Sequence, residues 1–513
     1  MVFSTENILL CGAVLLFISL FWERMAHKFE VFVLLLFLGL GMLVSSRSIG
    51  GIHFSNHDMA HLIGMIALAI ILFSGGMDAK FKEVKPIMVP SIILATLGVM
   101  LTALVAGVFI YWVTTTYFIK YELTFIESLL LASIVASTDF ALVFAILHSK
   151  GLRLKHNLGS LLEFESGSND VMAYLLLMTF LGYVTGSSGG DASFVHAGIA
   201  HVFGHGIGLN IVLFFYKLIV GALCGYFLGK LVVKVINRVN MSNGALYPIF
   251  LLAICLILFL FTELIEGSGF LAVYIGGLTV GNSRFVHKRS SKNFFDGFSW
   301  LAQILMFFTF GMLIDPTKLP LYAGIGITIG LFILIFARPL AVMACIFPFK
   351  KTPIKAKIFV SWVGLRGAVP LIFATCILAS DMAPEKKDIM FYIVFFIMLV
   401  SLLVQGNTVS SVANMLKLGD NSKHPKHSSE AEKCSEDIKP MLEITVQKEH
   451  LKEGNFLMDM ELSEETLIAM VKRGNHYFVP KGDTKIEEGD ILLTISEDDE
   501  ALCETCKNMG IKC

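Results

Sequence analysis

A run of polar side chains interrupts an apolar segment at residues 163–173. Glu165, Asn169 and Asp170 lie in this run, beside or inside what would be the hydrocarbon layer of a membrane. A charged group at the centre of a bilayer costs roughly 2.5–3.5 kcal/mol even on insertion scales. Ionisable residues in such a place usually mark a functional site, so we expect these residues to bind an ion.

The types of these side chains suit a hard monovalent cation and a proton. Asp170 supplies a carboxylate that can hold either ion. Thr138 and Ser166 can add hydroxyl oxygens, the kind of ligand that hard cations prefer. Glu165 lies close by, and Asn169 is a neutral neighbour, so a single titrating carboxylate indicates exchange of one proton for one cation without net charge movement. No thiolate or histidine group accompanies them, and we expect neither a resident metal nor a cofactor.

Two helices are predicted to break beside charged residues. Residues 136–140 read Ala-Ser-Thr-Asp-Phe, and such side chains compete for backbone hydrogen bonds. Irregular backbone at membrane depth is tolerated only where it is buried in protein or lines a cavity. Asp139 would then begin the second half-helix and offset its positive end. Residues 364–370 (GLRGAVP) predict a second break, where Arg366 would compensate a carbonyl end and pair with Glu165.

Static interpretations of these residues also remain open. The Ser-Thr-Asp run could simply bond between helices. Asp170 and Arg366 could form a buried structural pair, although hydrophobic residues in its place would be at least as stable. Arg338, which precedes Pro339 in another apolar segment, needs a buried partner that the sequence does not name, and we expect a structural ion pair for it.

The composition is that of an integral membrane protein. Of 513 residues, 55% are apolar and 16% are charged, whereas soluble domains carry about 25% charged residues. The net charge of −1 gives no basic footprint for nucleic acid. A span needs about 20 apolar residues, and thirteen segments are predicted, near 7–22, 29–46, 60–76, 87–113, 124–148, 160–184, 208–236, 245–265, 267–282, 297–314, 321–346, 356–379 and 387–414.

The two predicted breaks fall in the fifth and twelfth segments, seven apart. Two six-span halves joined by one linking span would make these segments equivalent members of inverted repeats. Interrupted segments at matching positions are a sequence pointer to a transporter's binding site. The predicted fold is therefore an all-α polytopic membrane protein with inverted repeats and two discontinuous helices, followed by a small α+β domain.

The loops between the segments predict the orientation in the membrane. Alternate loops, beginning with the first, hold 19 lysines and arginines, and the remaining loops hold 5. Because cytoplasmic loops carry the excess of basic residues, the N-terminus is expected outside and the C-terminus in the cytoplasm. We expect a multi-pass protein of a bacterial plasma (inner) membrane.

The hydrophobic part ends near Leu416. Residues 1–416 are predicted to form the membrane domain, 417–440 a polar linker and 441–513 a cytosolic domain. Strands are expected at 442–446, 466–472, 476–479 and 490–496, with a hairpin turn at 473–475 and a helix at 498–509. This domain shows no enzyme site, so a regulatory or dimerisation role is expected. Cys503 and Cys506 are interpreted as ordinary cytosolic thiols.

Six motifs, in order along the membrane domain, carry a resemblance to a known family. They are residues 72–77 (LFSGGM), 137–139 (STD), 165–170 (ESGSND), 267–274 (GSGFLAVY), 303–307 (QILMF) and 364–370 (GLRGAVP). The chain resembles the monovalent cation/proton antiporter superfamily, specifically the NhaP-type potassium(sodium)/proton antiporters. Residues 479–484 and 488–492 resemble the TrkA-C (RCK-C) domain that follows the membrane part in these proteins.

The resemblance implies thirteen spans, a homodimer, and alternating access by movement of a core domain against a dimerisation domain. It implies that Asp170 is the essential ion- and proton-binding residue, that Arg366 has a stabilising role, and that the residues around Asp170 are Asn169, Glu165, Ser166 and Thr138. The sequence departs from the family at Ser74, where an acid is common and often pairs with the arginine that corresponds to Arg338.

The predicted function is secondary active exchange of a monovalent cation for H⁺, in cytoplasmic pH, cation and volume homeostasis, and not an enzymatic activity. K⁺ is favoured over Na⁺ because the tail resembles modules of potassium transport systems. Membrane lipid and the transported ions are the expected partners, with a small molecule or nucleotide at the tail. Competing hypotheses are a tail-regulated cation channel, for which no repeated carbonyl filter motif is present, and a sodium/solute symporter.

Overall fold

The structure is a computed structural model in which the chain divides into two compact units, Met1–Asn421 and Ser422–Cys513. It describes residues 30–45, 56–150, 152–155, 157–185, 207–239, 241, 243–349, 352–420, 442–446, 466–474, 476–480 and 484–496. The predicted first span, 7–22, and the predicted helix at 498–509 lie outside these residues. The other twelve predicted spans coincide with helices or helix pairs in the first unit.

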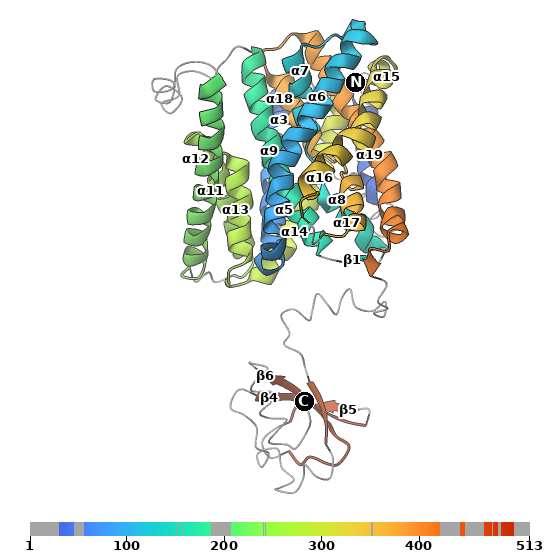
Figure 1. The fold of residues 1–513 in the computed structure, drawn as a ribbon. Coiled ribbons are helices and arrows are strands. Elements are labelled where there is room, and N and C mark those ends of the chain that lie inside the picture. The colour runs from blue at the N-terminus through green and yellow to red at the C-terminus, as the bar shows by residue number, and fades with distance from the viewer. Residues whose placement is uncertain are drawn as a thin grey trace. The chain divides into compact units, whose positions relative to one another are not determined.

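Six helices of the first unit pack mainly on one another, and we call them the scaffold bundle. Their centre is α3, which packs against α13 and α14, while α11 and α12 pack on α13 and α2 packs on α14. In Figure 1, α11, α12 and α13 stand together at one side of the unit. The members are α2 (Glu30–Val44), α3 (His57–Asp78), α11 (Ile207–Ile236), α12 (Leu246–Leu264), α13 (Gly269–Gly281) and α14 (Lys288–Leu313).

Glycines bring scaffold helices into backbone contact. A Cβ atom at Gly277 would overlap the carbonyl oxygen of Phe73, and one at Gly281 would overlap that of Met77. Gly41 and Gly311 allow the same approach between α2 and α14. Small residues that let helix backbones meet are a common source of helix association in membranes, where no hydrophobic effect drives helices together. We call these contacts the glycine seams.

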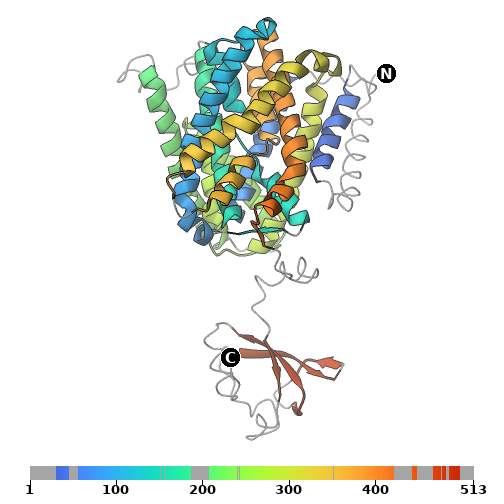
Figure 2. The ribbon, with the colours of Figure 1, turned by 45° about the vertical axis from the view of Figure 1, so that its right-hand side comes forward.

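The remaining helices form the core bundle. The span before the first break comprises α4 (Phe81–Val84), η1 (Lys85–Ile87), α5 (Met88–Ile93), η2 (Leu94–Gly98) and α6 (Val99–Thr116), and η3 (Ile119–Tyr121) follows in the loop. Next come α7 (Phe125–Ile134), α8 (Phe140–Ser149) and α9 (Leu158–Thr185). The second set comprises η4 (Pro316–Lys318), α15 (Leu319–Phe332), η5 (Ile333–Ala337), α16 (Arg338–Ile346), α17 (Ile354–Trp362), α18 (Val369–Ala379) and α19 (Pro384–Met415). Figure 2 shows α15 lying against α19.

The core bundle repeats its irregularities seven spans apart, as the predicted repeats require. The span that contains η2 and the span that contains η5 each have one π-helical turn. The helix pairs α7–α8 and α17–α18 are each interrupted by non-helical residues, 135–139 and 363–368. Both discontinuous helices are therefore confirmed. The two bundles meet along α3 and α18, where His61 Nδ1 lies 3.2 Å from Thr375 Oγ1.

The beginning of the predicted linker differs from the prediction. Residues 419–420 form β2 (Gly419–Asp420), which pairs antiparallel with β1 (Arg153–Leu154) in the first unit. The backbone N–H of Lys155 also donates to the carbonyl of Leu418 at 3.0 Å. Polar composition alone does not reveal such a two-residue pairing, so residues 417–420 belong with the first unit.

The described part of the second unit is a four-stranded antiparallel sheet in the order β3-β6-β4-β5. The strands are β3 (Leu442–Thr445), β4 (Thr466–Arg473), β5 (His476–Phe478) and β6 (Ile491–Ser496), close to the predicted ranges. Arg473 pairs with His476 across the hairpin. Gly474 has φ +59° there, a left-handed conformation that glycine adopts without strain. The hairpin prediction is thus confirmed.

Candidate ion-binding site

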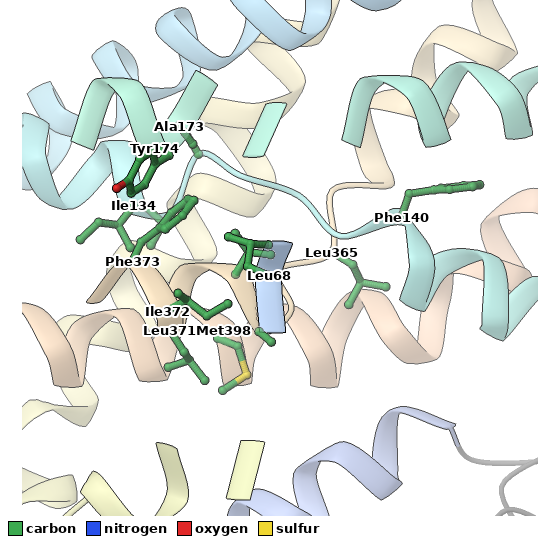
Figure 3. Close-up of a cluster of buried hydrophobic side chains, with 14 of the residues drawn as sticks. Leu68, Ile134, Phe140, Ala173, Tyr174, Leu365, Leu371, Ile372, Phe373 and Met398 are labelled. Atoms are coloured by element: carbon green, nitrogen blue, oxygen red, sulfur yellow. The ribbon is translucent and has the colours of Figure 1, made fainter. Parts of the chain in front are cut away.

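The two interrupted helices cross at their non-helical segments. The backbone N–H of Asp139 donates to the carbonyl of Leu365 at 2.7 Å. At Gly367 an added Cβ would overlap the Asp139 carboxylate, so the absence of a side chain here leaves room for that carboxylate. Figure 3 shows the stretch that ends at Phe140 and the stretch that holds Leu365 running past each other, with α18 side chains packed beneath.

Asp139 lies at the start of a half-helix and Arg366 within the second unwound segment, where they can offset the charges of the helix ends at the crossing. Asp139 precedes α8, and its Oδ1 accepts a hydrogen bond from the N–H of Leu142 at 3.3 Å. Arg366 is 2% exposed, and its Nη1 donates to the carbonyl of Ser137 at 2.5 Å. Each charged group therefore satisfies backbone freed by a break, which is costly to leave unpaired inside a bilayer.

Helix α9 presents its polar run to the first break. Ser166 Oγ donates to the carbonyl of Thr138 at 2.6 Å and accepts from the N–H of Phe140 at 3.0 Å. Asn169 Nδ2 donates to Thr138 Oγ1 at 2.5 Å, and its Oδ1 accepts from the N–H of Thr138 at 3.4 Å. These two side chains fix the unwound segment against α9, one turn of helix from Asp170.

Asp170 is the one member of the run with an open oxygen. Its side chain is buried, with 6% exposure, and Oδ1 has no hydrogen-bond partner among the described residues. Asp139, Glu165 and Arg366 lie near enough to interact with it electrostatically, and the Ser137 hydroxyl, which makes no well-formed hydrogen bond to Oδ1, lies beside the carboxylate. A buried carboxylate oxygen without a donor is unfavourable unless a proton or cation can occupy it. The structure thus brings the predicted site residues together at the helix crossing.

The predicted pairing of Glu165 with Arg366 is wrong. Glu165 Oε1 instead accepts from Arg338 Nη2 at 3.0 Å, and both side chains are only 1% exposed. Asn169 Nδ2 also donates to this oxygen at 3.0 Å. Arg366 is directed to the Ser137 carbonyl, whereas Arg338, at the start of α16, packs beside Gly364 and reaches α9. The partner of Arg338, which the sequence did not name, is therefore Glu165.

Two residues of α19 contact the second break, and they were not predicted from the sequence. Ser401 Oγ accepts a hydrogen bond from the backbone N–H of Arg366 at 2.9 Å and donates to Gln405 Oε1 at 2.7 Å. A serine and a glutamine four residues apart in an otherwise apolar helix were the available signal, because residues four apart share one helix face.

Comparison with known proteins identifies a family of similar sequences. The model of the sodium/hydrogen exchanger transmembrane family matches residues 13–415. The K(+)/H(+) antiporter NhaP of Alkalimonas amylolytica is 38% identical over 412 residues, covering 80% of this chain and 67% of the relative. The K(+)/H(+) antiporter NhaP2 of Shewanella sp. strain ANA-3 is 33% identical over 501 residues, covering 96% and 82%.

A solved structure shows the same fold. The sodium proton antiporter MjNhaP1 from Methanocaldococcus jannaschii aligns with a TM-score of 0.66 at 22% identity, covering 80% of this chain and 97% of that chain. The family match spans both broken helices and the whole polar run of α9. The chain belongs to the sodium/hydrogen exchanger family of membrane proteins and is a cation/proton antiporter.

Proposed function

We propose that the protein exchanges K⁺ for H⁺ and that the Asp170 carboxylate carries the two ions in turn. The observation that supports this assignment is the buried Asp170 carboxylate at the crossing of two broken helices, whose Oδ1 has no hydrogen-bond partner in the part of the chain that the structure describes. K⁺ is favoured over Na⁺ because the relatives that cover most of the chain are named K⁺/H⁺ antiporters. One open carboxylate supports electroneutral exchange.

The neighbouring groups have separate tasks in this proposal. Thr138 and Ser166 offer hydroxyl and carbonyl oxygens to a partly dehydrated cation. Asn169 supplies no second titrating group, and it holds the Thr138 segment in place. Glu165 neutralises Arg338, whereas the Arg366 guanidinium lies near enough to Asp170 to interact with its charge. The exchange is proposed to need no cofactor beyond the two ions.

Alternating access follows if the core bundle moves against the scaffold bundle only when Asp170 holds a proton or a cation. A charged Asp170 without a bound ion would not be carried across the membrane. The boundary along α3 and α18 is a side-chain contact, and it is the proposed sliding surface. We further propose a homodimer, a bacterial plasma-membrane location with the N-terminus outside, and a regulatory role for the C-terminal sheet as a TrkA-C-like domain. The basic loops support the orientation.

Reconstituted exchange tests the ion site. Full-length protein in proteoliposomes should show pH changes driven by K⁺ more strongly than by Na⁺ or Li⁺. Asp170→Asn should abolish them, because an amide neither releases a proton nor balances a cation. Asp381→Asn, which alters an exposed loop carboxylate, should leave exchange unchanged. Exchange that persists in Asp170→Asn would contradict the assignment, and ion currents far above carrier turnover would favour a channel.

A further inference from the structure

The second broken helix is fastened to α19 by two buried side chains. Gln405 Nε2 donates to the carbonyl of Trp362 at 2.6 Å, and Trp362 is the last residue of α17. Gln405 Oε1 accepts from Ser401 Oγ, which in turn accepts from the N–H of Arg366. Gln405 is 1% exposed and Ser401 3%. We call this chain of bonds the α19 relay, and it ties the end of α17 to the backbone in the middle of the break.

The relay needs an amide at position 405. The Trp362 carbonyl is among the final carbonyls of a helix, which lack an intrahelical partner. It accepts from the N–H of Gly364 at 3.0 Å, and Gln405 supplies the donor for its second lone pair. The side chain there must donate to this carbonyl and accept from Ser401 at the same time. An amide does both, an ionised carboxylate only accepts, and an aliphatic residue does neither.

The relay is connected to the ion-binding side of the crossing. It holds the backbone of Arg366, whose side chain holds the Ser137 carbonyl. The adjacent Leu365 carbonyl holds the N–H of Asp139. These two anchored residues flank Thr138, so a displaced relay would displace this segment, including the Ser137 hydroxyl that lies beside Asp170.

The first repeat has a related arrangement with one difference. Ser166, on the helix that follows the first break, bonds the unwound backbone as Ser401 does in the second repeat. Four residues after each serine comes Asp170 in one repeat and Gln405 in the other. The aspartate keeps an open oxygen, whereas both ends of the glutamine amide are bonded.

We propose that Ser401 and Gln405 are positioning residues of the ion site. In the second repeat Gln405 occupies the position that corresponds to Asp170, and its amide is uncharged and hydrogen-bonded at both ends, so it binds no ion. The protein consequently offers one exchange site rather than two. This inference rests on the proposed function, since it assigns a task to residues behind the helix crossing.

The test compares relay variants with a matched amide on the same helix. Gln405→Leu, Ser401→Ala and the double variant are assayed as full-length protein in proteoliposomes for K⁺-dependent proton exchange, normalised to folded protein. Asn407→Leu is the control, because the exposed Asn407 amide bonds only the Leu403 carbonyl of its own helix. Ser401→Thr retains the hydroxyl and serves as the conservative variant.

We expect Gln405→Leu to lower kcat/KM for K⁺ at least about tenfold, because small displacements of the groups in a binding site can have effects of this size. The apparent KM for K⁺ should rise several-fold, and Ser401→Ala should change it in the same direction. The double variant should be no worse than Gln405→Leu, since the two residues act as one unit. Ser401→Thr and Asn407→Leu should behave like wild type.

A loss confined to the yield of folded protein, with KM unchanged in Gln405→Leu, would overturn the positioning role. Strictly additive losses in the double variant would overturn the relay. The outcome for the ion site is separate: exchange retained by Asp170→Asn contradicts the proposed function whatever the relay variants do.

Discussion

Two buried acids on α9 illustrate opposite ways of keeping a charge within a membrane protein. Glu165 is matched by Arg338 at 3.0 Å and by the Asn169 amide, and it is 1% exposed. Asp170, little more than one turn further, has an oxygen with no partner in the described part of the chain. A charge that is already paired has little tendency to bind a further ion, so the proposed function gives Glu165 a structural role and makes Asp170 the residue that exchanges ions.

Removal of one partner of the buried pair should be costly. Glu165→Gln leaves the Arg338 guanidinium without a counter-charge, and breaking a buried pair this way typically costs about 3–5 kcal/mol. We expect a clear fall in the melting temperature of the detergent-solubilised protein. The double variant Glu165→Gln/Arg338→Met should recover most of the loss.

A half-exposed ion pair provides the control. Lys292 and Asp78 lie 2.8 Å apart with side chains 32% and 40% exposed, and such pairs contribute roughly 0–1 kcal/mol. Asp78→Asn should therefore hardly change the melting temperature. Equal shifts for Glu165→Gln and Asp78→Asn would show that burial does not determine the cost.

At the scale of helices, the crossing depends on a position without a side chain. Gly367→Ala places a methyl group on the Asp139 carboxylate, so this side chain must leave its position or the two unwound segments must separate. We expect loss of exchange, of at least about a hundredfold given the sensitivity of sites to displacements near 1 Å, measured in proteoliposomes. Gly297→Ala, on α14 where a Cβ meets no atom within 4 Å, should keep normal exchange.

The same helices show what the sequence could and could not predict. Residues 136–140 and 364–370 carry local signals, because Ser, Thr, Asp, Gly and Pro disfavour continuous helix wherever they occur. The partner of Arg338 carries no local signal. It depends on which face of α9 meets α16 in three dimensions, and the sequence does not contain that information. Ser401 and Gln405 did carry a local signal, as two polar residues on one face of an apolar helix, but the sequence did not show which backbone groups they bond.

At the scale of the whole chain, the second unit contains a network of charged residues of its own. Arg473 donates to both carboxylate oxygens of Asp490, at 2.9 and 2.7 Å, and the N–H of Glu487 donates to one of them at 2.9 Å. Burial raises the pKa of Asp490, but these hydrogen bonds outweigh it and leave the pKa below its usual value. The folded sheet thus stabilises the ionised form of Asp490 more than the unfolded chain does.

The sheet should accordingly lose stability in acid. The stabilisation is complete above the pKa of the unfolded aspartate and disappears as pH falls through the lower pKa of the folded state. Asp490→Asn should cost about 1–3 kcal/mol at neutral pH and remove most of this pH dependence. Hydrogen exchange of β3 and β6 peptides in the full-length protein measures both effects.

Glu487→Gln is the matched control in the same sheet. Its carboxylate lies 3.1 Å from Arg473 but is 57% exposed, so we expect little change in exchange rates. An acid dependence that survives in Asp490→Asn would assign the effect to another group.

The glycine seams limit where the transport movement can take place. Gly277 and Gly281 seat α13 directly on the backbone of α3, and Gly41 and Gly311 do the same for α2 and α14. Backbones in direct contact cannot slide without steric overlap, whereas the side chains between α3 and α18 can change partners. The scaffold should behave as one solid body, so larger residues at the seams would hinder folding and assembly, and substitutions along α3 and α18 would change the rate of exchange without altering the affinity for the ion.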